Sequence, residues 1–201
     1  VGARLVRRLE KPGRNVTGLS DLSPIHQHVE LIKSIMSDVD SIGVVYNPGE
    51  SNAVALISIL KSAAQQHGLA LHIEPVFTAD EVEEKTRIVA AKSDVVYAMT
   101  DNTIASAIDS LIQAADSQNT PVVAGTTAYV KNGAVIGAGL DYYQIGLETA
   151  EYVTAILEGE KPGKLNVKTP SHSTIKINLD ALKKFRITPP SSILDQATII
   201  Q

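Results

Sequence analysis

Three consecutive hydrogen-bonding side chains, Thr100, Asp101 and Asn102, directly follow the apolar run Val95–Met99. One such residue is enough to cap a helix, so three in a row exceed what capping requires. The Asp101 carboxylate could pair with a cationic group such as an α-ammonium, and Asn102 could bond a carboxylate or an amide. We favour ligand contact for Asp101, with helix capping alone as the alternative.

A second polar loop, Asn47–Asn52, follows the apolar run Ile42–Tyr46. Its Pro-Gly pair bends the chain, and Ser51 or Asn52 would cap the helix that comes next. The free N–H groups of that helix start could also bind a ligand carboxylate. Capping and ligand binding are compatible, and the sequence leaves both open.

Two further strand ends carry small or polar residues. Gly125-Thr126-Thr127 would let a ligand approach the backbone, although a plain loop fits equally well. Asp141-Tyr142-Tyr143 places a carboxylate beside two aromatic rings, which line a pocket or wedge a helix against the sheet. The candidate ligand-binding residues are therefore Ser51, Asn52, Thr100, Asp101, Asn102, Thr126 and Asp141.

Motifs for catalysis and metal binding are missing from the sequence. It has no Gly-x-Ser-x-Gly elbow, no phosphate-binding loop and no His-Glu-x-x-His. It has no cysteine, and none of its five histidines has metal-ligand spacing with a carboxylate, so each is expected to be exposed or fully hydrogen-bonded. We therefore predict no catalytic residue, no metal and no cofactor, and an α/β enzyme is the least favoured interpretation.

The polar loops follow β-branched runs that alternate with helical patterns. This alternation predicts an α/β fold with a mostly parallel, doubly wound sheet, and such sheets bind ligands beyond the carboxyl ends of their strands. Helices are expected over Val1–Glu10, Pro24–Val39, Thr103–Ala115 and Gln144–Leu157, a capping box at Thr78–Glu81, and an irregular tail from Pro189. The expected strands are Ile42–Tyr46, Leu69–Phe77, Val95–Met99, Val122–Ala124 and Val135–Gly139.

Composition and charge limit the classes of binding partner that the chain can have. The 201 residues are 44% hydrophobic with a formal net charge of −4, so no basic face for nucleic acid is predicted. No apolar run is long enough to span a membrane, and no signal peptide is present. Because the chain starts at Val1 inside a predicted helix, we expect it to be a fragment or a processed product.

A series of segments, taken in order, resembles the ABC-transporter substrate-binding proteins of the tryptophan/tyrosine-binding type. The resemblance covers nearly the whole chain, and it rests on the order and spacing of the segments together. The segments are Asn15–Gly18, Ile42–Asn52 (IGVVYNPGESN), Tyr97–Ser106 (YAMTDNTIAS), Val123–Thr126, Gly139–Gly146 (GLDYYQIG), Glu158–Pro162 and Ile175–Ile187 (IKINLDALKKFRI). Similar proteins often carry Asp where this chain has Thr126, which weakens any transfer of substrate identity at that corner.

The resemblance implies a two-lobed, type I periplasmic-binding-protein fold whose first lobe is largely absent from this chain. Residues 1–16 would be a remnant of the first lobe, 17–140 the second, ligand-binding lobe, and 141–162 a helix belonging to the first lobe. Residues 163–201 would return to the second lobe and form the C-terminal tail. Thr17-Gly18 and Gly139–Asp141 would be hinge crossovers.

The implied function is the solute-binding component of an ABC importer, which captures a small polar solute, an aromatic or other amino acid, between two lobes. Its partners would be the permease subunits, and its location periplasmic or extracytoplasmic, as a lipoprotein. The alternative is the effector-binding lobe of a lac-repressor-type regulator, which shares the fold. The apolar stripe of Gln144–Leu157, made for the absent lobe, could drive self-association of the chain.

Overall fold

The computed structural model describes residues 5–169 and 173–201. Contacts within the chain divide it into two compact units. Unit 1 comprises Val1–Leu22 and Leu140–Ser173, and unit 2 comprises Ser23–Gly139 and Thr174–Gln201. The boundaries expected from the resemblance, after residues 16, 140 and 162, differ mainly in giving 163–173 to the ligand-binding lobe. Which lobe of a larger protein each unit belongs to stays a prediction.

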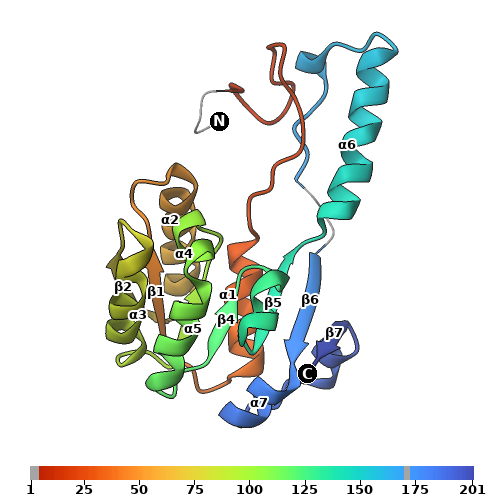
Figure 1. Cartoon of the computed structure of the whole chain (residues 1–201). Helices are drawn as coiled ribbons and strands as arrows, with labels where there is room; N and C mark the ends of the chain where they lie inside the picture. Colours follow the sequence, from red (N-terminus) through yellow and green to blue (C-terminus); the bar gives the residue numbers. More distant parts are fainter. Residues whose placement is uncertain (1–4, 170–172) are drawn as a thin grey trace. The chain divides into compact units, whose positions relative to one another are not determined.

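Unit 2 is built on a mostly parallel sheet, as the alternating pattern predicted (Figure 1). In the part of the chain that the structure describes, seven strands pair in the order β2-β1-β3-β4-β5-β6-β7. The five expected strands are all present and contiguous in this order. The strands are β1 (Ser41–Tyr46), β2 (Ala70–Pro75), β3 (Val95–Ala98), β4 (Val122–Ala124), β5 (Ile136–Leu140), β6 (Ser173–Asn178) and β7 (Ala197–Ile200).

Helices cover both faces of this sheet, because successive strand residues point to opposite sides. Val44 packs in a cluster with α1, α2 and α7, whereas its neighbour Val45 packs with α3, α4 and α5. The helices are α1 (Ile25–Ile35), α2 (Ser51–Gln66), α3 (Val82–Ala90), α4 (Asn102–Ser106), α5 (Ile108–Ser117), α6 (Tyr142–Leu157), α7 (Leu179–Phe185) and α8 (Ser191–Leu194). Short 3-10 turns occupy Ala79–Glu81, Thr127–Asn132 and Pro162–Lys164.

Two helix predictions were wrong. Leu5–Glu10 is not helical, and residues 1–4 of that predicted helix lie outside the described residues. A segment this short is marginal as a helix without packing, and only Val6 of its described residues is buried. The single helix expected over Thr103–Ala115 is broken at Ala107 into α4 and α5. At the break the Ser106 hydroxyl bonds back to the Thr103 carbonyl, a contact that bends helices.

The capping box and the tail also differ from expectation. The Thr78 side chain makes no capping bond, and the Glu81 carboxylate accepts from the Phe77 N–H at 2.7 Å instead of that of Thr78.

The tail is not irregular throughout, since it contains α8 and the strand β7. Parallel pairing with β6, in which Ile175 lies opposite Ala197, supplies the order that local sequence did not indicate.

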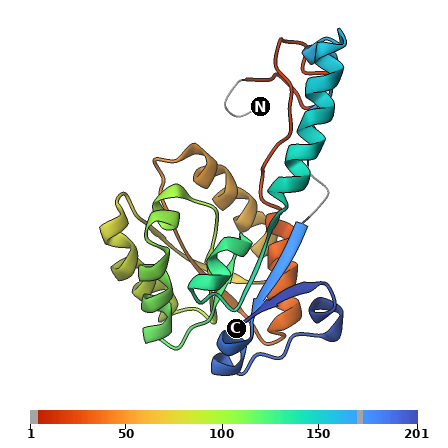
Figure 2. The ribbon, with the colours of Figure 1, turned by 45° about the vertical axis from the view of Figure 1, so that its right-hand side comes forward.

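Unit 1 consists of α6 and the segments that accompany it (Figure 2). Leu19 forms a parallel bridge with Lys168, the Thr17 hydroxyl donates to the Leu165 carbonyl at 2.8 Å, and the Tyr152 hydroxyl donates to the Asn166 carbonyl at 2.6 Å. None of the residues of α6, all of them described, is buried. Its exposed apolar side chains are Tyr142, Tyr143, Leu147, Val153 and Leu157.

Candidate functional site

Two loops meet at the carboxyl edge of the sheet because β1 and β3 are parallel neighbours, with Ile42 opposite Val95. The first loop, Asn47–Glu50, leads from β1 into α2, and the second, Met99–Asp101, leads from β3 into α4. We call their joined polar residues, with the first residues of α4, the strand-end network. It consists of Asn47, Glu50, Asp101, Asn102 and Thr103.

Asp101 holds the two loops together from the β3 side. Its side chain is only 3% exposed. One carboxylate oxygen caps α4 by accepting from the Ile104 N–H at 3.0 Å, and the other accepts from the Asn47 N–H at 2.7 Å. Burial raises the pKa of Asp101, while these hydrogen bonds act against that rise. The structure thus shows the capping role, and ligand contact by Asp101 stays a prediction.

Glu50 holds the loops together from the β1 side. One carboxylate oxygen accepts from the Asn102 N–H at 3.0 Å and the Asn102 amide at 2.6 Å. The other accepts from the Thr103 N–H at 3.0 Å and the Thr103 hydroxyl at 2.8 Å. Burial alone would raise the pKa of Glu50, but these four hydrogen bonds outweigh it and lower the pKa to about 2. Sequence reasoning missed this residue, since its partners lie 52 and 53 positions away.

Asn47 completes the network. Its amide oxygen accepts from the Gly49 N–H at 2.7 Å, and its amide nitrogen donates to the Thr103 hydroxyl oxygen at 2.8 Å. The N–H of Ala105 donates to the Asp101 carbonyl at 2.8 Å. This is the first bond within α4, and the N–H groups of Asn102, Thr103 and Ile104, which a helix start normally leaves free, are satisfied by Glu50 and Asp101.

The start of α2 differs from the start of α4. Glu50 is the N-cap of α2, but its side chain is directed to α4 and makes no capping bond on α2. The expectation that Ser51 or Asn52 caps this helix was wrong, because both are its first helical residues. Both side chains are exposed at the carboxyl edge of the sheet. The sequence-predicted pair therefore lies beside the strand-end network, at a helix end without a side-chain cap.

The remaining candidates have local partners. The Thr100 hydroxyl lies 2.9 Å from that of Ser23, and the Thr126 hydroxyl accepts from the Ala128 N–H at 3.3 Å. Asp141 belongs to unit 1, where it caps α6 by accepting from the N–H groups of Tyr143 and Gln144 at 3.0 and 3.2 Å. The structure thus brings Ser51, Asn52, Thr100, Asp101, Asn102 and Thr126 to the strand ends of unit 2.

A buried pair of side chains, His28 of α1 and Tyr97 of β3, lies close to the end of β4. The Tyr97 hydroxyl lies 2.7 Å from His28 Nδ1, and both side chains are buried. His28 Nε2 has no partner, which corrects the expectation that each histidine is exposed or fully hydrogen-bonded. Burial lowers the pKa of His28 to about 4. A Cβ on Gly125 would lie 2.6 Å from the Tyr97 hydroxyl, so this position at the end of β4 requires glycine.

Tyr129 is a second side chain that sequence reasoning missed. It is 8% exposed and packs with the apolar cluster of α3, α4 and α5. Burial, and then the negative charge of Asp101, raise the pKa of its hydroxyl to about 12. The Asp101 charge therefore acts on the Tyr129 hydroxyl, on the same side of the sheet as α4.

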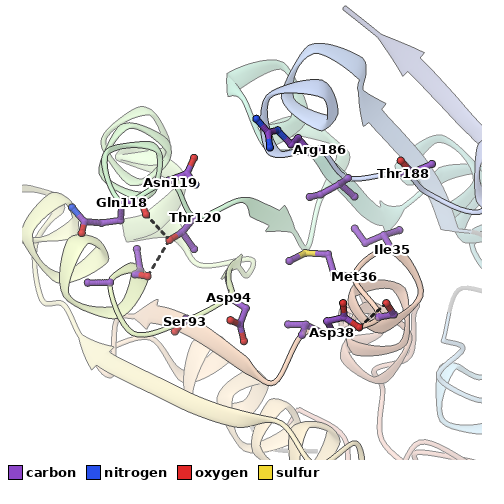
Figure 3. A pocket seen from close by; sticks show the side chains of 15 residues that line it. Ile35, Met36, Asp38, Ser93, Asp94, Gln118, Asn119, Thr120, Arg186 and Thr188 are labelled. Carbon is purple, nitrogen blue, oxygen red and sulfur yellow. Dashed lines mark hydrogen bonds between the residues drawn. The ribbon is translucent and has the colours of Figure 1, made fainter.

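A cavity of about 650 Å³ lies at the opposite edge of the sheet (Figure 3). Asp94 and Thr120, which precede β3 and β4, line it together with Arg186 at the end of α7. The Asp94 carboxylate is committed to the Ser41 hydroxyl and to the N–H groups of Asp40 and Ser41. None of the sequence-predicted ligand residues lines this cavity. Among the described residues no group of three or more His, Asp or Glu is placed to hold a metal ion.

Solved structures of known proteins resemble this chain in fold and sequence. The crystal structure of a conserved domain protein from Vibrio cholerae is 52% identical, with a TM-score of 0.91 over 100% of this chain and 68% of that one. A Streptococcus pneumoniae ABC domain in complex with L-Trp is 32% identical, with a TM-score of 0.89 over the same shares. The likeness confirms the periplasmic-binding-protein-like fold of parallel strands and covering helices.

The family model for ABC transporter substrate binding proteins matches residues 1–200, and this chain belongs to that family. The tyrosine-binding protein of Clostridioides difficile is 34% identical over 183 residues, which cover 91% of this chain and 53% of that protein. The chain thus spans about half the length of the curated relatives it matches. No described helix has the length and apolar character needed to cross a membrane. These relatives favour a substrate-binding protein over the alternative of a lac-repressor-type effector lobe.

Proposed function

We propose that unit 2 is one ligand-binding lobe of an importer's substrate-binding protein, and that the ligand is an aromatic amino acid. The observation that carries this is the polar edge of unit 2, in a chain that matches an L-Trp-bound relative over 100% of this chain and 68% of that one at a TM-score of 0.89. A tyrosine-binding relative at 34% identity supports the same ligand class. The names of both relatives describe binding and not catalysis.

The two ends of an amino acid have separate candidate partners in unit 2. Its carboxylate suits the start of α2 at Ser51 and Asn52, where no side chain caps the helix. Its ammonium suits the acceptor side of the strand-end network, near Asn102 and Asp101. Thr100 and Thr126 would line the edge between neighbouring strand ends. Ligand contact by Asp141, which belongs to unit 1, stays a separate prediction.

Capture would use closure of two lobes. Relatives are longer than this chain, which supports a second lobe in the intact protein, to which residues 1–16 and 141–162 would belong. A ligand that contacts both lobes favours the closed state by its differential affinity. The closed form would then be recognised by the permease subunits. The family also supports an extracytoplasmic location, and we propose that the protein is anchored there by a lipid.

Calorimetric titration of the intact protein with each of the twenty amino acids tests this proposal. Tryptophan or tyrosine should bind most tightly, and Asn52→Ala should weaken that binding roughly tenfold, as expected for losing a hydrogen bond to a charged group. Gln65→Ala, an exposed change near the other end of α2, is the matched control and should leave affinity unchanged. Binding of no amino acid, or equal affinities for the two variants, would contradict the ligand class or the site respectively.

A further inference from the structure

We propose that Glu50 determines which end of the ligand this lobe holds. Its carboxylate occupies the N–H groups at the start of α4 and turns the side-chain amide oxygen of Asn102 outward. That oxygen would accept a hydrogen bond from the ligand's ammonium group. The inference rests on the proposed function. It adds the role of Glu50 and the direction in which the ligand's ammonium and carboxylate groups lie. Glu50 is a positioning residue in this account, and Asn102 makes the contact.

The first step is the reciprocal clasp between the two loops. Asp101, from the β3 side, accepts an N–H of the β1 loop at Asn47. Glu50, from the β1 side, accepts the N–H groups of Asn102 and Thr103. Because each loop supplies a carboxylate to the N–H groups of the other, neither loop can shift alone without leaving donors unpaired.

The second step is the orientation of the Asn102 amide. Its nitrogen lies 2.6 Å from a Glu50 oxygen. An ionised carboxylate only accepts hydrogen bonds, so the NH₂ group must face Glu50 and the amide oxygen must face away. Asn102 is exposed, and its amide oxygen has no hydrogen-bond partner among the described residues. Glu50 therefore sets up an outward acceptor at the ligand edge.

The negative charges of Glu50 and Asp101 lie close to the Asn102 amide oxygen. Glu50 keeps its negative charge at neutral pH because four donors stabilise it, and the Asp101 carboxylate lies buried within the same network. No Lys or Arg is paired with Glu50 or Asp101 among the described residues. An acceptor backed by carboxylates attracts an ammonium group and repels a carboxylate.

A ligand carboxylate could in principle displace Glu50 from α4. It would have to break four hydrogen bonds and could at most form the same four, so the exchange offers no net gain. The displaced Glu50 would also remain close to the incoming negative charge. Displacing Glu50 therefore gives the ligand carboxylate no advantage, and we expect it to bind elsewhere.

The test compares three ligands on the intact protein by calorimetry. For tryptophan these are L-tryptophan, tryptamine, which lacks the carboxylate, and indole-3-propionate, which lacks the ammonium. Glu50→Gln should weaken L-tryptophan and tryptamine by the same factor, at least about tenfold. It should leave indole-3-propionate within about twofold, because that ligand has no ammonium to lose. Glu84→Gln, an exposed carboxylate change on α3, is the matched control.

The outcomes are distinct. Tighter binding of L-tryptophan to Glu50→Gln would mean that Glu50 competes with the ligand carboxylate, and would overturn the inference. Equal weakening of all three ligands would mean a merely structural role, and would also overturn it. Asn102→Ala removes only the side-chain bond and leaves Glu50 the backbone N–H at position 102 and its two bonds to Thr103, so it should reproduce the ammonium-selective loss even if Glu50→Gln does not fold. If the unaltered protein binds neither tryptophan nor tyrosine, the proposed function fails instead.

Discussion

Lowering the pH should destabilise this fold through one buried side chain, His28. Its Nδ1 is paired with the Tyr97 hydroxyl, its Nε2 has no partner, and burial lowers its pKa from 6.5 to about 4. Above pH 6.5 His28 is neutral in both the folded and the unfolded chain, so it contributes no pH dependence. Below that pH the unfolded chain takes up a proton that the folded chain refuses, and stability falls as the pH falls.

The two pKa values fix the size of the effect. The full loss, reached below pH 4, corresponds to about 3 kcal/mol, at about 1.36 kcal/mol for each pH unit between the values. About 2 kcal/mol of it should be lost by pH 5. The pKa of Glu50, lowered to about 2, has the opposite linkage, since the stability it contributes is present above the ordinary carboxyl pKa and lost as the pH falls toward 2. The interval from pH 7.5 to 5 therefore isolates histidine titration.

Urea unfolding of the wild type and of His28→Gln, measured across that interval, checks the reasoning. Glutamine can keep a hydrogen bond to the Tyr97 hydroxyl but cannot titrate, so the variant should lose about 2 kcal/mol less than the wild type between pH 7.5 and 5. The comparison of slopes cancels the other histidines and any fixed cost of the substitution. Equal slopes in the two proteins would refute the idea that His28 is held neutral by burial.

Three further outcomes follow from named contacts. Gly125→Ala should lower the free energy of unfolding by about 1–3 kcal/mol in urea titrations, because its Cβ would meet the Tyr97 hydroxyl at 2.6 Å; an unchanged midpoint would contradict this. Asp101→Ala should cost about 2–4 kcal/mol in the same assay, since it strands the N–H groups of Asn47 and Ile104. The chain by itself should self-associate in light scattering through α6, and the double substitution of Leu147 and Val153 by Glu should shift it toward monomer; a monomeric unsubstituted chain would speak against that stripe.

The sheet was predictable because its strands are short β-branched runs, such as Ile42–Tyr46, bounded by polar loops. Both faces are buried, so every residue of β3 is apolar and the run stands out. The strand β7 did not stand out, because it is a short, half-exposed run whose order comes from pairing with β6. The break between α4 and α5 was also missed, since the apolar periodicity of the two helices continues across Ala107.

The sequence predicted where the polar candidate residues lie, but it did not predict the hydrogen bonds that join them. Polar residues after β1 and β3 indicated the carboxyl edge, and their side chains do gather there in unit 2. The sequence could not show that β1 and β3 are neighbours, because β2 lies between them in the chain and pairs on the other side of β1. Glu50 could not be predicted as a partner of Asn102 and Thr103 without knowing that β1 and β3 are neighbours.

The strand-end network changes what the predicted site residues mean. Asp101 looked like the ammonium partner, yet both of its oxygens serve the backbone and it is 3% exposed. The groups left free for a ligand are those the network presents outward: the Asn102 amide oxygen and the uncapped start of α2 at Ser51 and Asn52. The Glu50 and Asp101 carboxylates join the two loops and place negative charge at this edge, and in our proposal the ligand is contacted by their neutral neighbours. We therefore propose that such a lobe would orient an amino-acid ligand with its ammonium group toward α4 and its carboxylate toward α2.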